Sequence, residues 1–226
     1  MGRGIDTLKV SLPGGGMDRV TLLVLHGADP SELKRSAAWA VSCSRAVEVV
    51  AVDGGYDACR AAGIAVQRYV GDGDSVARPP RDVEIHSYPA DKDYSDLAGA
   101  LRTVRRNGAD ALFVAGLLGG RIDHEFANLQ ELARATRCHR AILSCGERGA
   151  WILTRHGLRL GTRAGRRFSL FAATSRTCVT LRGARWTLRA KRLLRPSHGL
   201  SNVTTGPLDL QVHDGMAHLL FPATRV

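Results

Sequence analysis

Short apolar runs alternate with amphipathic segments through the first two thirds of the chain. The apolar runs have the length of buried strands and lie at 20–26, 47–52, 67–70, 83–88, 111–115 and 140–144. Between four pairs of these runs the pattern favours helices, at 30–45, 56–62, 95–106 and 122–135. Parallel strands need such crossover segments. The pattern therefore predicts an α/β fold, with a mostly parallel sheet and helices on both faces.

The first of these helices has clear start signals. Asp29 is a suitable N-cap residue, and Pro30 would occupy the first helical position. Glu32 stands three residues after Asp29, which is the spacing of a capping box. We therefore expect the side chain of Glu32 to bond back to the start of its own helix.

The pattern changes near Gly146. From Ala150 onward only short alternating runs remain, at 151–154, 168–172, 178–181, 186–190 and 216–221. This spacing predicts an all-β domain, either a sandwich or a small barrel. We expect three parts: a flexible N-terminal extension at 1–19, an α/β domain at 20–148 and a β-rich domain at 149–226.

Basic residues are concentrated in the last third of the chain. Residues 151–226 contain 13 Lys and Arg against two acidic residues, whereas residues 1–150 contain 19 of each sign. Such a segment attracts polyanions. A nucleotide with about four negative charges needs only a few basic groups. We therefore interpret the excess as mostly solvated surface and expect no specific nucleic-acid partner.

The cysteines and the hydropathy indicate a cytoplasmic protein. The five cysteines are odd in number and form no CxxC pair, which favours buried, reduced thiols over zinc or disulfides. No run approaches the ~18 apolar residues of a membrane span. The N-terminal residues lack the apolar core of a signal peptide. We expect no membrane partner.

Four acidic turns follow four consecutive apolar runs. They are Asp53-Gly54-Gly55, Gly71-Asp72-Gly73-Asp74-Ser75, Lys92-Asp93-Tyr94-Ser95-Asp96 and Gly119-Gly120-Arg121-Ile122-Asp123-His124. The carboxyl ends of parallel strands meet at one edge of a sheet, where open α/β sheets bind ligands. Crowded carboxylates repel one another unless a hard cation joins them, and Mg²⁺ with a polyphosphate is the usual ligand. The turns predict a metal-dependent enzyme that uses a nucleotide.

Each turn also has a plainer interpretation. Asp72 and Asp74 can face one cation, but solvated acids are common in turns. Asp93 and Asp96 share one face of a first helical turn, where acids also compensate the helix dipole. Arg121 offers a forked donor to phosphate at a helix N-terminus, or is a surface arginine. It is the combination of the four turns that favours a site.

In this order, the four turns and the late pair Ser201-Asn202 resemble the motifs of thiamine pyrophosphokinases, over roughly residues 20 to 221. The resemblance implies an α/β catalytic domain followed by a β-rich thiamine-binding domain. It implies transfer of diphosphate from ATP to the hydroxyl of thiamine, giving thiamine diphosphate and AMP, with Mg²⁺. It also implies a homodimer, in which each thiamine site lies between the N-terminal domain of one subunit and the C-terminal domain of the other.

The resemblance assigns the acidic residues to metal binding and catalysis. It places Asp72, Asp74 and Asp96 on Mg²⁺. It places Asp53 and Asp93 in support of that site. An aspartate on this edge is also a candidate for the group that takes the proton of the hydroxyl.

The remaining motif residues are assigned to the substrates. The resemblance places Lys92 and Arg121 near the phosphates and Asp123 on the thiamine side. Ser201 and Asn202 would reach thiamine from the second domain. No GxxxxGK[ST] sequence is present, so the chain is not a P-loop enzyme.

The chain departs from the family pattern on the acceptor side, which leaves two alternatives. Val203 and Thr204 follow Ser201-Asn202, where some members place an aromatic residue that stacks on thiamine. One alternative keeps diphosphate transfer but uses a pterin alcohol as acceptor. The other is a non-catalytic polyanion-binding protein that uses the basic β-rich domain. The second alternative leaves the four acidic turns unexplained.

Overall fold

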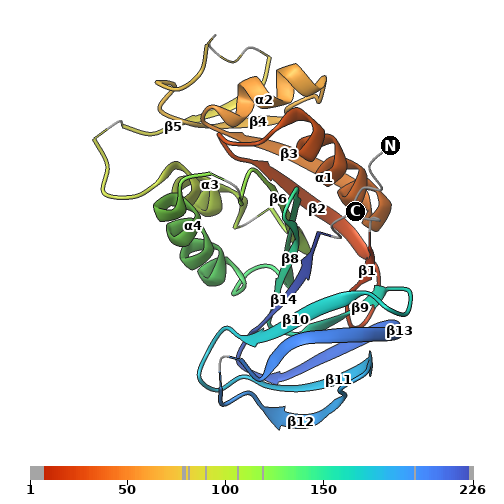
Figure 1. The fold of residues 1–226 in the computed structure, drawn as a ribbon. Coiled ribbons are helices and arrows are strands. Elements are labelled where there is room, and N and C mark those ends of the chain that lie inside the picture. Colours follow the sequence, from red (N-terminus) through yellow and green to blue (C-terminus); the bar gives the residue numbers. More distant parts are fainter. Residues whose placement is uncertain are drawn as a thin grey trace.

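The protein has a mixed α/β fold with one large sheet and few helices, which confirms the predicted mixed class (Figure 1). The computed structural model describes residues 8–77, 80, 82–89, 91–105, 107–118, 120–195 and 197–223. The helices in these residues are α1 (Pro30–Cys43), α2 (Gly55–Ala62), α3 (Asp96–Val104) and α4 (Ile122–Ala135). The strands are β1 (Lys9–Ser11), β2 (Met17–Val24), β3 (Ser44–Val52), β4 (Arg68–Gly71), β5 (Glu84–Ser87), β6 (Ala111–Ala115), β7 (Ala141–Gly146), β8 (Gly149–Thr154), β9 (Gly157–Gly161), β10 (Arg167–Ala172), β11 (Cys178–Ala184), β12 (Leu188–Arg192), β13 (Gly199–Asp214) and β14 (Ala217–Pro222).

The strands β2 to β7 form a parallel region whose order determines where a ligand can bind. The order is β5-β4-β3-β2-β6-β7, and all five neighbouring pairs are parallel. The chain starts in the middle at β2, moves outward to β5, and then returns to the other side of β2 as β6. The order therefore reverses between β2 and β6. In open α/β sheets a ligand crevice lies beyond the carboxyl ends of the strands at such a reversal.

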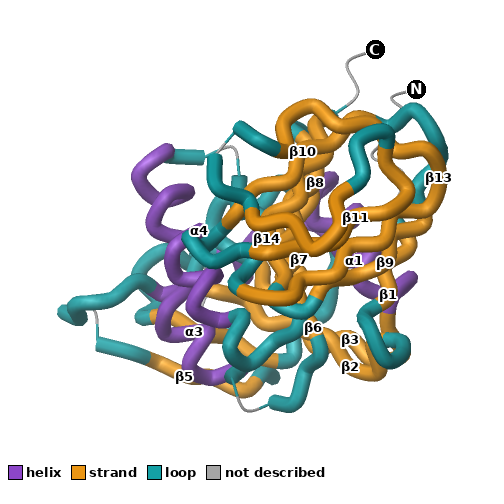
Figure 2. Tube along the Cα trace, turned by 90° about the horizontal axis from the view of Figure 1, so that it is seen from below, coloured by secondary structure: helices purple, strands orange, loops and turns teal. Residues whose placement is uncertain are grey.

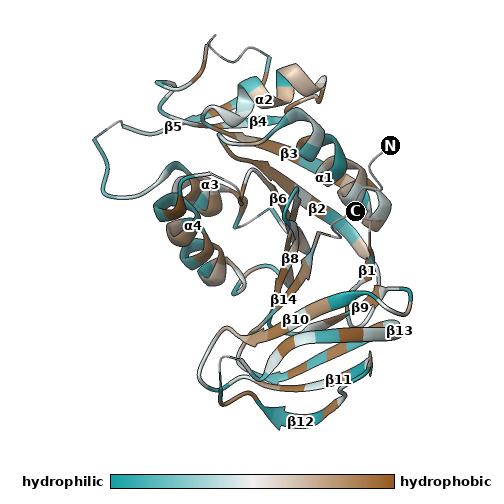
Figure 3. Cartoon of the chain, in the orientation of Figure 1, coloured by the Kyte–Doolittle hydropathy of each residue, from teal (hydrophilic) through white to brown (hydrophobic). Residues whose placement is uncertain are grey.

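Helices cover the parallel strands on both sides (Figures 1 and 2). Successive side chains of a strand point to opposite faces. On one face Leu22 of β2 shares a hydrophobic core with Trp39 of α1. On the other face Leu23 shares a second core with Leu97 of α3 and Leu132 of α4. Burial on both faces explains why β2 and β3 are mostly hydrophobic toward their carboxyl ends, as Figure 3 shows. The edge strand β5 is polar and largely exposed.

The expected boundary at residue 148 does not interrupt the sheet. β7 and β8 form an antiparallel hairpin around Glu147 and Arg148, and β14 and β10 continue the same sheet beyond β8. A further group of antiparallel strands, β1, β9, β11 and β12, joins through β13. Backbone hydrogen bonds therefore run continuously across the proposed boundary. The division into two domains stays a prediction.

The sequence patterns missed the strands at 157–161 and 199–214. β13 is 16 residues long and includes Gly206 and Pro207, which normally indicate a turn. Its first part pairs with β10 and its later part pairs with β9 and β11. One strand therefore serves two neighbouring groups of strands. The change of partners hides the simple alternation that a strand prediction relies on.

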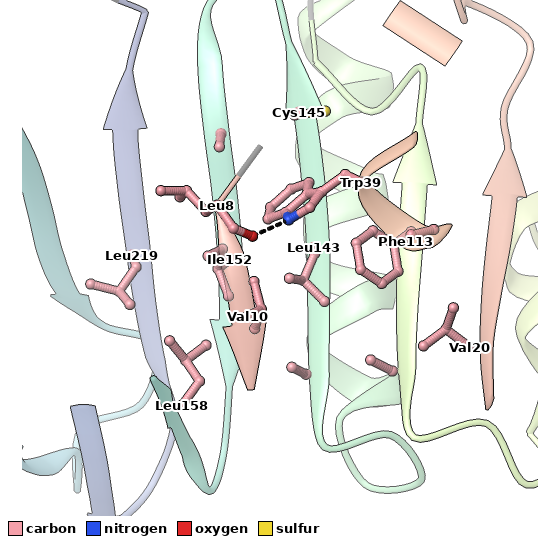
Figure 4. Close-up of a cluster of buried hydrophobic side chains, with 14 of the residues drawn as sticks. Leu8, Val10, Val20, Trp39, Phe113, Leu143, Cys145, Ile152, Leu158 and Leu219 are labelled. Carbon is pink, nitrogen blue, oxygen red and sulfur yellow. Dashed lines mark hydrogen bonds between the residues drawn. The ribbon is translucent and has the colours of Figure 1, made fainter. Parts of the chain in front are cut away.

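The expectation of a flexible extension at 1–19 is wrong for the part that the structure describes. Residues 1–7 lie outside the described residues, but β1 pairs with β9, and Leu8, Val10 and Leu12 are buried. The indole Nε1–H of Trp39 donates a hydrogen bond to the carbonyl of Leu8 (Figure 4). The alternation of apolar and polar residues at 8–12 was a strand signal that the glycines at 14–16 obscured.

Cysteine burial agrees only in part with the expectation. Cys59 and Cys145 are buried free thiols, Cys43 and Cys178 are half-buried, and Cys138 is exposed. Burial raises the pKa of Cys59 to about 12, so that this thiol stays protonated at neutral pH. The expectation of buried thiols is therefore wrong for Cys138, which lies beyond the end of α4.

Part of the basic surface lies on an edge strand. The β12 strand at the edge of its sheet exposes Arg189, Lys191 and Arg192. Charged side chains on an edge strand discourage edge-to-edge pairing, which gives them a role without any ligand.

Among the described residues, no helix combines the length and the apolar character that crossing a bilayer requires.

The packing of β1 against the core can be tested by shortening the side chain of Val10. Val10→Ala removes two methyl groups from a buried position and should lower the free energy of unfolding by about 1–3 kcal/mol. Lys9→Ala, at the exposed neighbouring position, should change it by less than about 0.5 kcal/mol. Urea unfolding followed by circular dichroism measures both. Equal stability of Val10→Ala and wild type would show that this segment is not docked in solution.

Candidate functional site

The turn after β3 holds Asp53 in a fixed and unusual conformation. Asp53 is buried and has a φ of 48°, a backbone angle that residues other than glycine rarely adopt. Its N–H donates to the carbonyl of Val70 on β4. A Cβ at Gly54 would overlap the ring of His26, and a Cβ at Gly55 would overlap the carbonyl of Val24. The two glycines therefore let this turn lie directly against the end of β2.

The turn after β4 brings Asp72 and Asp74 to the same edge. Gly73 between them has a φ of 87°, as the sequence suggested for a sharp turn. The N–H of Asp74 donates to Asp72 Oδ1 at 3.3 Å. A second anchor comes from α2, where Asp57 Oδ2 accepts the N–H of Ala77 at 2.7 Å. The loop is thus held both by its own aspartate and by the preceding helix.

Three of the predicted acidic residues meet at this edge. One carboxylate oxygen from each of Asp53, Asp72 and Asp74 lies within 4.8 Å of the other two. Asp53 Oδ1 is buried and has no hydrogen-bond partner. A buried, unpartnered carboxylate oxygen costs free energy unless a cation or donor satisfies it. Oxygen ligands of this kind suit a hard divalent cation, so the three residues fit Mg²⁺.

Lys92 links this carboxylate cluster to Asp96. Its Nζ lies 3.0 Å from Asp72 Oδ2 and 3.1 Å from Asp96 Oδ1, and its side chain is only 8% exposed. The hydrogen bond from Lys92 holds the pKa of Asp72 below its ordinary value, and the same bond raises the pKa of Lys92. In this structure Asp96 therefore contacts the ammonium group and lies outside the group of three carboxylates.

Tyr69 is a residue of this region that the sequence patterns did not reveal. It lies on β4, is buried, and packs edge to face against Tyr56. Burial and the neighbouring carboxylates of Asp53, Asp72 and Asp96 raise its pKa to about 12. A Cβ at Gly71 would lie 2.8 Å from its hydroxyl oxygen. The only sequence signal was an aromatic residue two positions before an acidic turn. Such a residue more often belongs to the hydrophobic core than to a functional site.

The turn after β6 is placed differently from the other three. Gly119 lies outside the described residues. Arg121 and Asp123 form a bidentate ion pair with each other at 3.2 and 2.6 Å, and their side chains are 73% and 59% exposed. The hydrogen bond from Arg121 lowers the pKa of Asp123 to about 2. His124 is also exposed. Among the described residues, neither side chain of this pair forms a hydrogen bond or ion pair with the three carboxylates.

The contact that Glu32 makes differs from the predicted capping box. Its role in this region is the second one that the sequence patterns did not reveal. The Asp29 side chain caps α1 as expected, accepting the N–H groups of Ser31 and Glu32. Glu32 does not complete a capping box: its Oε1 accepts the N–H of Gly116, just beyond β6, at 2.8 Å. Glu32 is buried, and burial raises its pKa. Its carboxylate therefore fastens α1 to the loop at the strand reversal between β2 and β6.

The remaining predicted residues do not belong to the group of three carboxylates. Asp93 is exposed and lines a cavity between α3 and α4. Ser201, with a φ of 59°, and Asn202 lie on β13. The Asn202 side chain accepts the N–H of Trp186 and donates to its carbonyl, at 3.1 and 2.8 Å. Trp186 is 53% exposed, so Asn202 holds an aromatic side chain at the surface.

Solved structures of thiamine pyrophosphokinases share this fold. The enzyme from Bacillus subtilis has a TM-score of 0.73 and 18% identity, over 92% of this chain and all of the other. The enzyme from Geobacillus thermodenitrificans has a TM-score of 0.72 and 22% identity, over 91% and 98%. The enzyme from Candida albicans has a TM-score of 0.66 and 13% identity, over 91% and 89%. At these identities the likeness shows the fold alone.

The segment that contains the acidic turns also matches in sequence. Residues 41–143 match the family model for the catalytic domain of thiamin pyrophosphokinase, and this range includes all four turns. No curated protein matches the chain. The predicted resemblance to thiamine pyrophosphokinases is therefore confirmed: the chain has a segment that matches the catalytic domain of that family, on a fold that the family shares.

The glycines that position Asp53 provide one test of this geometry. Gly55→Ala should lower the free energy of unfolding by about 1–3 kcal/mol, because its methyl group would overlap the backbone of β2. Gly16→Ala is the matched control, since nothing lies within 4 Å of the added methyl group. Thermal melts of the two variants give the comparison. A normal melting temperature for Gly55→Ala would contradict the close approach of this turn to β2.

The pair of Asp72 and Lys92 predicts a defined pH dependence. Because the folded pKa of Asp72 is lowered, its contribution to stability is present above its unfolded pKa of about 3.9 and is lost as pH falls further. Because the folded pKa of Lys92 is raised, its contribution is present below about pH 10.4 and is lost as pH rises further. Asp72→Asn should therefore be less stable than wild type from about pH 5 to 9. The difference should shrink by about pH 3, as urea unfolding would measure, and a constant difference would argue against this ion pair.

Proposed function

We propose that the protein is a thiamine pyrophosphokinase, which transfers diphosphate from MgATP to the hydroxyl of thiamine and gives thiamine diphosphate and AMP. The observation that carries this proposal is the group of Asp53, Asp72 and Asp74, with Lys92 beside it, at the ligand-binding edge of the sheet. The confirmed family resemblance supports the reaction class.

The metal would be held by the three carboxylates that lie within 4.8 Å of one another. When bound, Mg²⁺ supplies positive charge to the phosphate oxygens and orients the polyphosphate. The unpartnered Oδ1 of Asp53 fits this role, because coordination would satisfy an otherwise isolated oxygen. Asp96, assigned to the metal by the resemblance, shares Lys92 with Asp72 in this structure. Lys92 contacts its Oδ1, so its second carboxylate oxygen would be the one to join the metal site.

The protein residues contribute mainly position and charge. Lys92, pinned between two carboxylates, presents a fixed ammonium group near the expected phosphates. Arg121 is exposed and can exchange Asp123 for phosphate oxygens, which match its forked geometry. The hydroxyl of thiamine would attack the β-phosphorus in line, and catalysis would rest on this alignment.

A carboxylate on this edge would take the proton of the attacking hydroxyl. Tyr69 lies beside the same carboxylates, but its pKa of about 12 keeps it protonated at neutral pH. It therefore cannot act as the base. Its buried hydroxyl has no hydrogen-bond partner among the described residues, so it would be available to donate to an aspartate or to a bound ligand.

The acceptor side of the site would come from a partner subunit. Six strands lie between β13 and β3 in the sheet order. At about 4.8 Å per step, Asn202 and Asp53 are separated by roughly 34 Å along the sheet. A separation of this order along the sheet favours a thiamine site that a second subunit completes, as in the expected homodimer. Trp186, held by Asn202, would supply the aromatic surface that is missing after Ser201-Asn202.

Loss of one carboxylate tests the proposed reaction. Asp72→Asn and Asp74→Asn should each lower the rate of thiamine diphosphate formation by at least ~100-fold, because each removes a charge aimed at the metal. Asp91→Asn, which changes an exposed acid near the same edge, is the control. Mass spectrometry of thiamine diphosphate and AMP follows the reaction. Near-normal rates in both variants would exclude the proposed metal site, and transfer to a pterin alcohol but not to thiamine would change the acceptor.

Mixed dimers test whether the site is shared. Asp72→Asn and Trp186→Ala alter opposite sides of each proposed site, and each variant alone should be nearly inactive. Random reassembly of the two should restore about a quarter of wild-type activity, because half of the dimers then contain one intact site of two. A mixture of Asp72→Asn with Asp74→Asn is the control and should stay inactive. Failure of the first mixture to gain activity, with dimers present by sedimentation, would rule out a shared site.

A further inference from the structure

A cavity of about 420 Å³ lies between α3 and α4, which run side by side in both Figure 1 and Figure 2. Its walls include Asp93 and Tyr94 before α3, but none of the three clustered carboxylates and not Lys92. Four arginines line it: Arg102 and Arg105 from α3 and its end, and Arg134 and Arg137 from the end of α4. A volume of this size suits a small-molecule ligand.

The four guanidinium groups form no ion pairs with the described residues. None of them has a carboxylate within 4.0 Å among the residues that the structure describes. Arg102 instead lies over the ring of Tyr94, with its Cζ 3.9 Å from the ring centre. Such stacking holds a guanidinium group in place while leaving its N–H donors available.

Helix dipoles alone do not account for this concentration of charge. Arginine near a helix C-terminus compensates about half a negative charge. Two helix ends, together with Asp93 and Glu131 in the walls, amount to about three negative charges against four positive ones. The cavity therefore remains positive. Because guanidinium groups form paired hydrogen bonds with phosphate oxygens, the matching ligand group is a phosphate.

The rest of the cavity indicates what the phosphate would be attached to. Ala98, Leu101 and Ala135 give it apolar walls. His139 is buried and its Nδ1 donates to the carbonyl of Ala109. Burial lowers the pKa of His139, which favours a neutral ring in the lining. We propose that this cavity binds a small organic phosphomonoester, with the phosphate on the arginines and a flat or apolar group beside Leu101.

The position of the cavity gives its occupant a way to influence the carboxylate edge. Asp93 and Tyr94 line the cavity, and they lie between Lys92 and Asp96, which contact each other at 3.1 Å. A ligand bound to Arg102 contacts the side chain that is stacked on Tyr94, and it therefore acts on the segment that places the ammonium group against Asp72. This consequence rests on the proposed function, whereas binding in the cavity does not.

Cys138 offers a direct measure of occupancy, because it lines the cavity and is exposed. Full-length protein is alkylated with iodoacetamide in the presence of EDTA, and the rate at each cysteine is followed by mass spectrometry. Phenyl phosphate at saturation should slow alkylation of Cys138 at least fivefold, whereas phenol should not. Cys178, on β11, is the internal control and should react at an unchanged rate.

Paired variants separate this cavity from general surface charge. Arg134→Gln with Arg137→Gln should weaken protection of Cys138 by phenyl phosphate at least tenfold in concentration, and Arg102→Gln with Arg105→Gln should do the same. Arg189→Gln with Arg192→Gln, on exposed β12, should leave it within twofold of wild type. Absent protection in wild type, or equal loss in the β12 variant, would overturn the site. Thermal melts confirm that each variant is folded.

The effect on the carboxylate edge has its own readout. With free Mg²⁺ held constant, saturating phenyl phosphate should change the apparent KM for ATP at least twofold in wild type and leave it unchanged in Arg134→Gln with Arg137→Gln. An unchanged KM in wild type, with Cys138 protected, would overturn the influence on the reaction. An inactive wild-type protein that still protects Cys138 would reject the proposed function and support the cavity.

Discussion

Repulsion between carboxylates at the ends of β3 and β4 is the constraint around which this structure is organised. Two unit charges 4.8 Å apart repel by about 3 kcal/mol at an effective dielectric constant of ~20. Three such groups therefore need compensation. Lys92 supplies one positive charge from a nearly buried position between Asp72 and Asp96. A divalent cation would supply the rest, which is the physical basis for proposing a metal site here.

The fold keeps these charges together by fixing backbone rather than by packing side chains. Asp53 is held at a positive φ by its bond to Val70 and by the two glycines that follow it. On the other side of β2, Glu32 of α1 fastens the loop after β6. Strained backbone and a buried carboxylate both cost stability, and they persist here because the surrounding parallel strands leave few alternatives.

The β-rich part of the chain contributes through geometry of a different kind. Asn202 uses its whole amide group to hold the backbone of Trp186, so that an aromatic ring stays exposed on a rigid strand. Within the chain the ring lies beside Arg185, whose Cζ is 5.1 Å from the ring centre. In the proposed dimer, a second subunit would bring its carboxylate edge to this exposed ring.

The sequence by itself determined the alternation of strands and helices, the turns at which the acids lie, and the family that those turns resemble. It could do so because strand and helix periodicity, Asp29 and Pro30 at a helix start, and glycines beside acids are local signals. It misjudged residues 8–12, β13 and Glu32, since each of these depends on partners distant in the chain. Only the tertiary structure decided that Asp53 joins Asp72 and Asp74, that Asp96 meets Lys92, and that Asn202 supports Trp186. Distances between strands are set by sheet order and packing, which no local pattern encodes.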